Sequence, residues 1–127
     1  MNGTALGVTP ETMARYRATA RRRAQAQQVA LARRREHAWQ IARRAATLLT
    51  RQFEARQVFL FGSLAHGYWF NERSDIDLAV SGLPPGAVWR AWSAMEEICE
   101  GFEINLVEME AASDLLLQQI EAYGCEL

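Results

Sequence analysis

The sequence predicts an α/β (α+β) fold in which a long helix precedes a small sheet flanked by helices. Residues 10–53 contain no glycine and no proline after Pro10, and they are rich in the helix formers Ala, Arg, Gln and Leu. Short apolar runs near 57–61, 75–81 and 102–107 have lengths typical of strands. The segments that follow these runs, near 63–67, 86–99 and 111–123, are expected to be helical.

The long helix has a clear start signal. Thr9 is a capping residue, Pro10 occupies the first helical position, and Glu11 places an acid in the first turn. A continuous helix to about Phe53 would be roughly 60 Å long, about twice the diameter of a small domain, so we expect part of it to project. Only its second half carries a continuous apolar stripe, formed by Trp39, Ile41, Ala42, Ala45, Ala46, Leu48, Leu49 and Phe53. The prediction is a basic helical arm at 1–35 and one domain at 36–127.

Charge is divided unevenly along the chain. The net charge is −1, but residues 1–56 hold twelve arginines and three acids, whereas 57–127 hold two arginines and twelve acids. Every basic residue is arginine, which forms bidentate contacts with carboxylate and phosphate. The triplets at 21–23 and 33–35 suggest nucleic acid, but arginine all around a helix is more typical of a solvated arm or a protein-docking surface. Another acidic protein, a nucleic acid and a second copy of the chain all remain open as partners of the arm.

Composition limits the remaining classes. The 127 residues, half of them apolar, suffice for one domain. No apolar run approaches the ~20 residues needed to span a bilayer. Residues 1–10 have no apolar core behind a basic start, so a secretory signal is not expected. Cys99 and Cys125 have no metal-ligand spacing and are expected to be reduced thiols. We therefore expect a cytoplasmic protein without a membrane partner.

The chemistry is concentrated between Val58 and Val80. Gly62 and Ser63 follow an apolar strand, and a glycine lets the backbone approach phosphates while N–H groups and a hydroxyl turn toward them. Eleven residues separate Ser63 from Asp75, and Asp75 and Asp77 lie on the same face of the next strand. Neighbouring carboxylates favour a hard cation such as Mg²⁺, which takes carboxylates and substrate phosphates as ligands. The combination predicts a nucleotide–metal site.

This pattern of Gly-Ser followed about ten residues later by Asp-x-Asp resembles the polymerase-β-like nucleotidyltransferase superfamily. Over residues 36–127 the chain looks most like the minimal nucleotidyltransferase (MNT) proteins, which are often paired with HEPN partners. The resemblance implies a small mixed or antiparallel sheet, with the strand at 75–81 antiparallel to the first. It also implies that Asp75 and Asp77 bind Mg²⁺ and that Gly62 and Ser63 hold the triphosphate of ATP.

The third acid of that superfamily is replaced here. In the run at 102–107, Asn105 stands where an aspartate is expected. An amide offers one carbonyl oxygen but cannot accept a proton, and loss of a general base commonly costs about 10²–10⁴ in rate. Glu103 lies two residues away on the same strand and is a weaker candidate for the missing carboxylate.

Most of the other residues near the motif have more than one interpretation. His66 contacts phosphate or is a surface histidine, and Arg73, next to Ser74, neutralises the triphosphate or merely offsets Glu72. Ser74 is grouped with them as a nucleotide-binding candidate. The run at 68–70 stacks a base, docks a partner or closes the core, and core closure is favoured. His37 is expected to be a solvated or interface histidine.

The resemblance implies transfer of AMP from ATP to a hydroxyl. In MNT–HEPN toxin–antitoxin pairs the acceptor is a tyrosine of the HEPN ribonuclease toxin, and we expect such a partner here. The first alternative is a non-catalytic antitoxin that neutralises its partner by direct binding, which Asn105 favours. The second is a nucleic-acid-binding module that uses the basic helix, and self-association through that helix is a further option.

Overall fold

The long helix forms as the sequence predicts. The computed structural model describes residues 7–67 and 69–127, and the chain divides into two units, 1–33 and 34–127. Helix α1 (Pro10–Phe53) contributes to both units. The Thr9 hydroxyl accepts a hydrogen bond from the Thr12 backbone N–H at 3.1 Å, which is the expected N-cap. The buried residues of α1 all belong to the second unit: Ala38, Ile41, Ala42, Ala45, Ala46 and Leu49.

The second unit contains a mixed four-stranded sheet with the order β3-β2-β1-β4. Its strands are β1 (Gln57–Phe61), β2 (Ile76–Ser81), β3 (Ile104–Glu108) and β4 (Cys125–Glu126). Strand β1 is antiparallel to β2 and to β4, whereas β2 and β3 are parallel. The predicted fold class and the antiparallel β1–β2 pair are confirmed, and the short strand β4 was not predicted.

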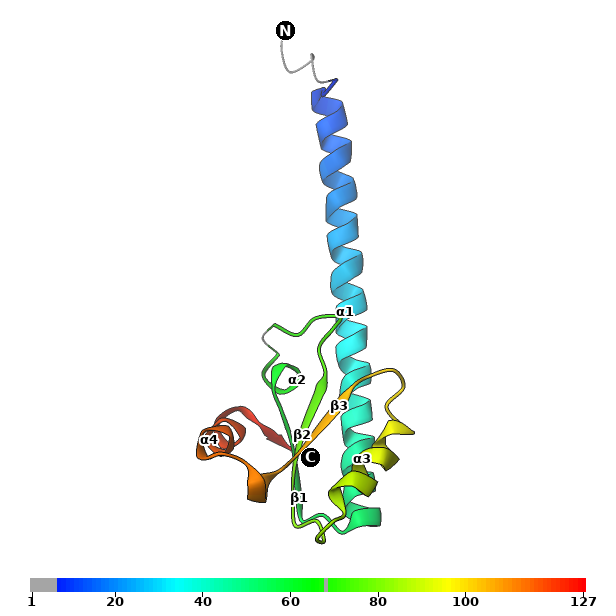
Figure 1. The fold of residues 1–127 in the computed structure, drawn as a ribbon. Coiled ribbons are helices and arrows are strands. Elements are labelled where there is room, and N and C mark those ends of the chain that lie inside the picture. Colours follow the sequence, from blue (N-terminus) through cyan, green and yellow to red (C-terminus); the bar gives the residue numbers. More distant parts are fainter. Residues whose placement is uncertain (1–6, 68) are drawn as a thin grey trace. The chain divides into compact units, whose positions relative to one another are not determined.

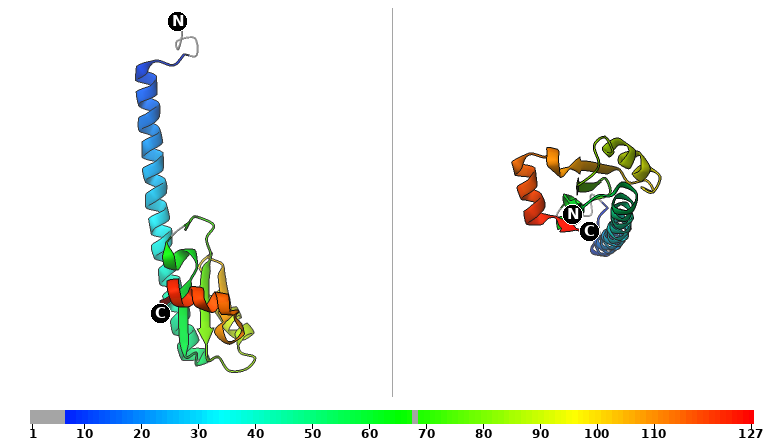
Figure 2. Two further views of the ribbon diagram at one scale, coloured as in Figure 1. Left: turned by 90° about the vertical axis from the view of Figure 1, so that its left-hand side faces the viewer. Right: turned by 90° about the horizontal axis from the view of Figure 1, so that it is seen from below.

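Helices lie on both sides of this sheet. Within residues 34–127, the end of α1 and α3 (Val88–Glu96) lie on one side, and α4 (Asp114–Tyr123) lies on the other (Figures 1 and 2). Side chains of β2 alternate between the two faces, so that Ile76, Leu78 and Val80 share one face and are fully buried. Asp77 points to the opposite face. The short helix α2 (Ser63–His66) follows β1 directly.

Two helices are shorter than the sequence suggested. The helix expected at 86–99 begins only at Val88, because Gly86 has a left-handed φ of +79°. Its regular part ends at Glu96, and Glu100 and Gly101 then take positive φ values. The helix expected at 111–123 begins at Asp114, where the Ser113 hydroxyl accepts a hydrogen bond from the Leu116 N–H at 3.2 Å. The 3-10 turn η2 (Met109–Ala111) precedes it.

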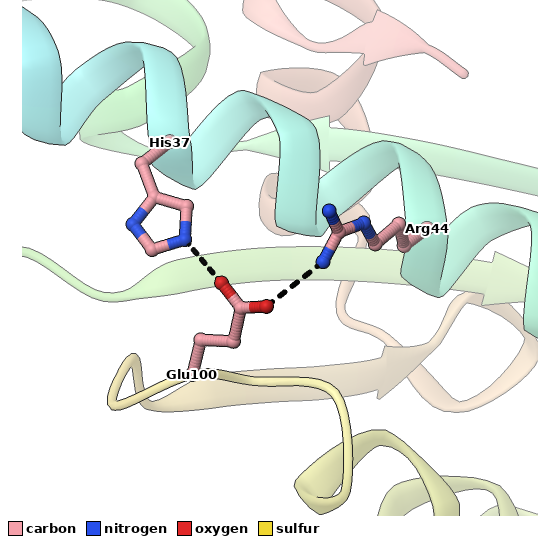
Figure 3. Close-up of polar contacts among 3 residues, drawn as sticks. All are labelled: His37, Arg44 and Glu100. Atoms are coloured by element: carbon pink, nitrogen blue, oxygen red, sulfur yellow. Dashed lines mark hydrogen bonds and ion pairs between the residues drawn. The ribbon is translucent and has the colours of Figure 1, made fainter.

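Side chains tie the helices to the sheet and its loops. The Trp92 indole N–H donates a hydrogen bond to the Ile104 carbonyl of β3 at 2.9 Å. Glu100 accepts hydrogen bonds from His37 and from Arg44, the latter at 3.0 Å (Figure 3). His37 therefore pairs within the unit and remains half-exposed. No helix in the described part of the chain combines the length and the apolar character that crossing a bilayer requires.

Candidate functional site

Three polar side chains predicted from the sequence converge at one end of the sheet. Asp77 lies in β2, Asp75 directly precedes that strand, and Asn105 is the register partner of Asp77 in β3. The Asn105 Nδ2 donates to Asp77 Oδ1 at 3.1 Å and to Asp75 Oδ2 at 3.3 Å. The two carboxylates therefore face the same side, as strand alternation requires.

The Gly62 turn borders the same carboxylates. Phe61, the residue before it, pairs with Asp77 in the antiparallel register. Gly62 has a left-handed φ of +76°, and a Cβ on it would overlap Asp77 Oδ2. Only glycine fits this position without displacing the carboxylate. The acidic pair and the small-residue turn thus lie side by side at one site.

The electrostatics of the site favour a bound cation. Burial raises the pKa of Asp77, and the neighbouring charge of Asp75 raises it further, whereas the hydrogen bond from Asn105 lowers it in part. A cation between the two carboxylates would relieve both unfavourable effects. Among the described residues no three His, Cys, Asp or Glu side chains form a cluster that could hold a metal ion.

The available ligands suit Mg²⁺, which commonly binds one or two carboxylates together with substrate phosphates. Asp75 and Asp77 supply the carboxylates. Asn105 points its NH₂ group at them, and an NH₂ group has no lone pair for a metal. Its amide would have to turn by half a rotation for Oδ1 to become a ligand.

Two of the remaining nucleotide-binding candidates, Ser63 and His66, lie in the short helix that follows Gly62. Ser63 is the first residue of α2 and is partly exposed, next to Gly62. His66 ends the same helix, and its ring lies nearly perpendicular to that of Trp69 at a centroid distance of 6.1 Å. Both therefore lie beside the turn that contacts Asp77.

Ser74 and Arg73 make structural contacts in the loop before β2. The Ser74 hydroxyl accepts a hydrogen bond from the Asn71 N–H at 2.9 Å, and its carbonyl accepts one from Arg34 at 3.3 Å. The Arg73 N–H donates to Asn71 Oδ1 at 2.7 Å, and the Arg73 side chain is exposed. These contacts shape the loop that leads into Asp75.

The aromatic run divides between core and surface. Phe70 is buried, in line with the favoured interpretation, whereas Trp69 is 87% exposed. Tyr68 lies outside the described residues. Glu103, the weaker candidate for the third carboxylate, is exposed and lines a separate cavity of about 400 Å³ with Trp92 and Cys99.

A second cavity borders the site and was not predicted. It has a volume of about 550 Å³ and is lined by Phe61, Gly62, His66, Trp69, Gln119 and Tyr123. Gln119 and Tyr123 come from α4, far from the motif in sequence. Their only signal in the sequence is an aromatic residue at the end of the last helix, which identifies no ligand by itself.

Comparison with known proteins agrees with this geometry. The family model described as Polymerase beta, Nucleotidyltransferase matches residues 44–127. A chain from a crystallised toxin–antitoxin complex with AMP-PNP is 27% identical, with a TM-score of 0.54, over 65% of this chain and 69% of that chain. A chain from a mutant MntA–HpeT toxin–antitoxin complex is 26% identical, with a TM-score of 0.53, over 63% and 67%.

A third solved structure shares the fold. It is a tri-AMPylated Shewanella oneidensis HEPN toxin in complex with an MNT antitoxin, and the matched chain is 24% identical with a TM-score of 0.53 over 70% of each chain. No curated protein matches the sequence at a comparable level. The family model spans more than half of the chain and contains every residue of the carboxylate site. The chain therefore belongs to the polymerase beta nucleotidyltransferase family, as the Gly-Ser and Asp-x-Asp pattern predicted.

Proposed function

We propose that this protein is the MNT antitoxin of a HEPN toxin and that it transfers AMP from ATP to a hydroxyl of that toxin, most simply a tyrosine. The main support for this proposal is that Gly62 contacts the Asp77 carboxylate in a chain of the nucleotidyltransferase family. The likeness to toxin–antitoxin complexes, one of them crystallised with AMP-PNP, supports both the partner and the nucleotide.

The reaction forms one bond and breaks another at the α-phosphorus of ATP. The acceptor oxygen attacks this phosphorus, the bond to the bridging oxygen of the β-phosphate breaks, and pyrophosphate leaves. Asp75 and Asp77 would hold Mg²⁺, which when bound neutralises charge on the phosphates and the leaving group. Gly62 lets the triphosphate approach the backbone, and Ser63 offers it an N–H and a hydroxyl.

Asn105 limits this reaction. The acceptor hydroxyl loses its proton as it attacks, and an amide cannot take it. The proton must then pass to water or to a phosphate oxygen, which is a slower route than a positioned carboxylate. We therefore expect slow transfer that an acid at position 105 would accelerate.

Label transfer from α-labelled ATP to a co-purified HEPN toxin, in the presence of Mg²⁺, tests this function. Asp77→Ala should abolish the transfer because it removes a metal ligand. Asn105→Asp should increase it, whereas Glu103→Gln should leave it unchanged because Glu103 lines a different cavity. Transfer that persists in Asp77→Ala would contradict the proposal.

The hydrogen bonds from Asn105 to both carboxylates favour one alternative, a non-catalytic antitoxin that neutralises the toxin by contact. In that case the toxin would be inhibited without labelling, and Asn105→Asp would still transfer nothing. Inhibition by the Asp77→Ala variant, equal to that of the wild type, would identify this mode.

A further inference from the structure

We propose that the cavity next to Gly62 binds the base of the nucleotide, with Trp69 and Tyr123 as the aromatic surfaces on which it stacks. This inference rests on the proposed function and adds to it the residues that would recognise the nucleoside. The cavity of about 550 Å³ lies within the size range of small-molecule sites, about 300–1,000 Å³.

The cavity opens on the same side of the sheet as the carboxylates. Phe61 lines it and is the register partner of Asp77, so that both side chains point to one face. Gly62 also lines it and contacts Asp77 directly. A triphosphate held at the Gly62 turn would therefore carry its nucleoside to the mouth of this cavity.

The lining has the chemistry of a base site. Trp69 is 87% exposed and Tyr123 is 69% exposed, so that both offer aromatic surface to a ligand. Gln119 presents an amide that both donates and accepts hydrogen bonds, as the edge of a base requires. Among the described residues that line the cavity, none is an arginine or a carboxylic acid. This favours a flat uncharged heterocycle over a phosphate or an acidic peptide.

Two segments far apart in sequence form the site. Trp69 follows α2, and its ring lies nearly perpendicular to that of His66 at a centroid distance of 6.1 Å. Gln119 and Tyr123 lie one helical turn apart on α4, which places them on the same side of that helix. Base recognition would thus join the loop after the Gly-Ser turn to the last helix of the chain.

Binding measurements on the full chain test the proposal. The probes are ATP and inorganic tripolyphosphate, each with Mg²⁺, because the second carries phosphates without a base. Stacking on an aromatic side chain is worth about 1–3 kcal/mol per base, so Trp69→Ala should weaken ATP binding by at least about 5-fold. Tripolyphosphate binding should not change. Tyr123→Ala should behave in the same way, and Tyr123→Phe should retain most of the affinity.

Trp89→Ala is the matched control. Trp89 is also an exposed tryptophan, 72% accessible, but it stacks on Trp92 and lies outside the cavity. Its removal should change neither ligand. Equal affinity of the wild type for ATP and tripolyphosphate would overturn the base site and leave the proposed function standing.

The base site would also be overturned if Trp69→Ala and Tyr123→Ala left the ATP affinity unchanged but slowed label transfer to the toxin. In that case the cavity would bind the acceptor side chain of the toxin. Failure of the wild type to bind either ligand would overturn the proposed transferase function together with the base site. Circular dichroism of each variant verifies that the fold is intact.

Discussion

The amide nitrogen of Asn105 lies 3.1 Å from Oδ1 of Asp77, its neighbour across the parallel β2–β3 pair. The same nitrogen reaches Asp75. One uncharged side chain therefore donates hydrogen bonds to both carboxylates. This arrangement determines how the site should respond to substitution, to pH and to Mg²⁺.

Asn105→Asp should destabilise the metal-free protein. It replaces two hydrogen bonds to ionised groups with a third negative charge, and we expect a loss of about 2 kcal/mol in the free energy of unfolding. Mg²⁺ should restore more stability in this variant than in the wild type, since the ion then meets three carboxylates. Urea denaturation with and without Mg²⁺ measures both effects. Gln118→Glu, which adds a charge on the exposed side of α4, should show neither.

Asp77→Asn should stabilise the metal-free protein at neutral pH. Burial and the Asp75 charge raise the pKa of Asp77 above its ordinary value of 3.8, so the folded state resists ionisation of this group. The contribution of Asp77 to the free energy of unfolding is most favourable below pH 3.8, where the group is protonated in both the folded and the unfolded state. This contribution is lost as the pH rises through the higher pKa of the folded state.

The gain from Asp77→Asn should therefore be largest near neutral pH and should disappear below pH 3.8. Thermal denaturation across this pH range measures it. A gain of the same size at every pH would show that ionisation of Asp77 is not its cause. The variant should also lose the stabilisation by Mg²⁺ that we expect for the wild type.

Gly62→Ala should disrupt the site by two separate effects, which Gly86→Ala can distinguish. Both glycines have positive φ values, +76° and +79°, so an alanine at either is strained, and the ψ of −160° at Gly62 lies in a region that is essentially restricted to glycine, where the strain is about 1–3 kcal/mol. A Cβ at position 86 meets no atom within 4 Å, whereas one at position 62 overlaps Asp77 Oδ2. Gly62→Ala should therefore cost more in chemical denaturation, and it alone should abolish the response to Mg²⁺. Equal costs would contradict the contact.

Glu100→Gln should weaken the tie between α1 and the loop before β3. The hydrogen bond from His37, followed by that from Arg44, holds the pKa of Glu100 below its ordinary value of 4.5. The stability that the carboxylate contributes is present above pH 4.5 and is lost as the pH falls through its lower folded-state pKa.

The difference in melting temperature between wild type and Glu100→Gln should accordingly vanish in strong acid. Because Glu100 is exposed, we expect a small effect that salt reduces further. Glu36→Gln, which removes an exposed carboxylate of α1 outside this cluster, serves as the control. A pH-independent difference would point to packing rather than charge.

Local signals predicted those parts of the fold that short segments determine. Thr9 and Pro10 identified the start of α1, because capping depends on residues within one turn. Strand alternation placed Asp75 and Asp77 on one face. The antiparallel β1–β2 pair followed from the family resemblance rather than from any single residue.

Features that depend on distant contacts were not predicted. Strand β4 has only two residues and forms by pairing with the edge of β1, so no apolar run in the sequence predicts it. The hydrogen bonds of Asn105 require the parallel register of β2 and β3, which its own sequence neighbourhood does not fix. Tyr123 lines the cavity next to Gly62 because α4 packs against β1. The catalytic, metal-binding and nucleotide-binding roles stay predictions for all of the assigned residues: Gly62, Ser63, His66, Arg73, Ser74, Asp75, Asp77 and Asn105.

The indole N–H of Trp92 donates a hydrogen bond to the Ile104 carbonyl of β3, a strand at one edge of the sheet. An outer strand with free backbone groups invites pairing with other chains and aggregation. Any foreign strand that approached from this side would first have to displace the tryptophan. Trp92→Phe, which removes the indole N–H, should therefore leave this edge of the sheet open to pairing with other chains and make the protein more prone to aggregate.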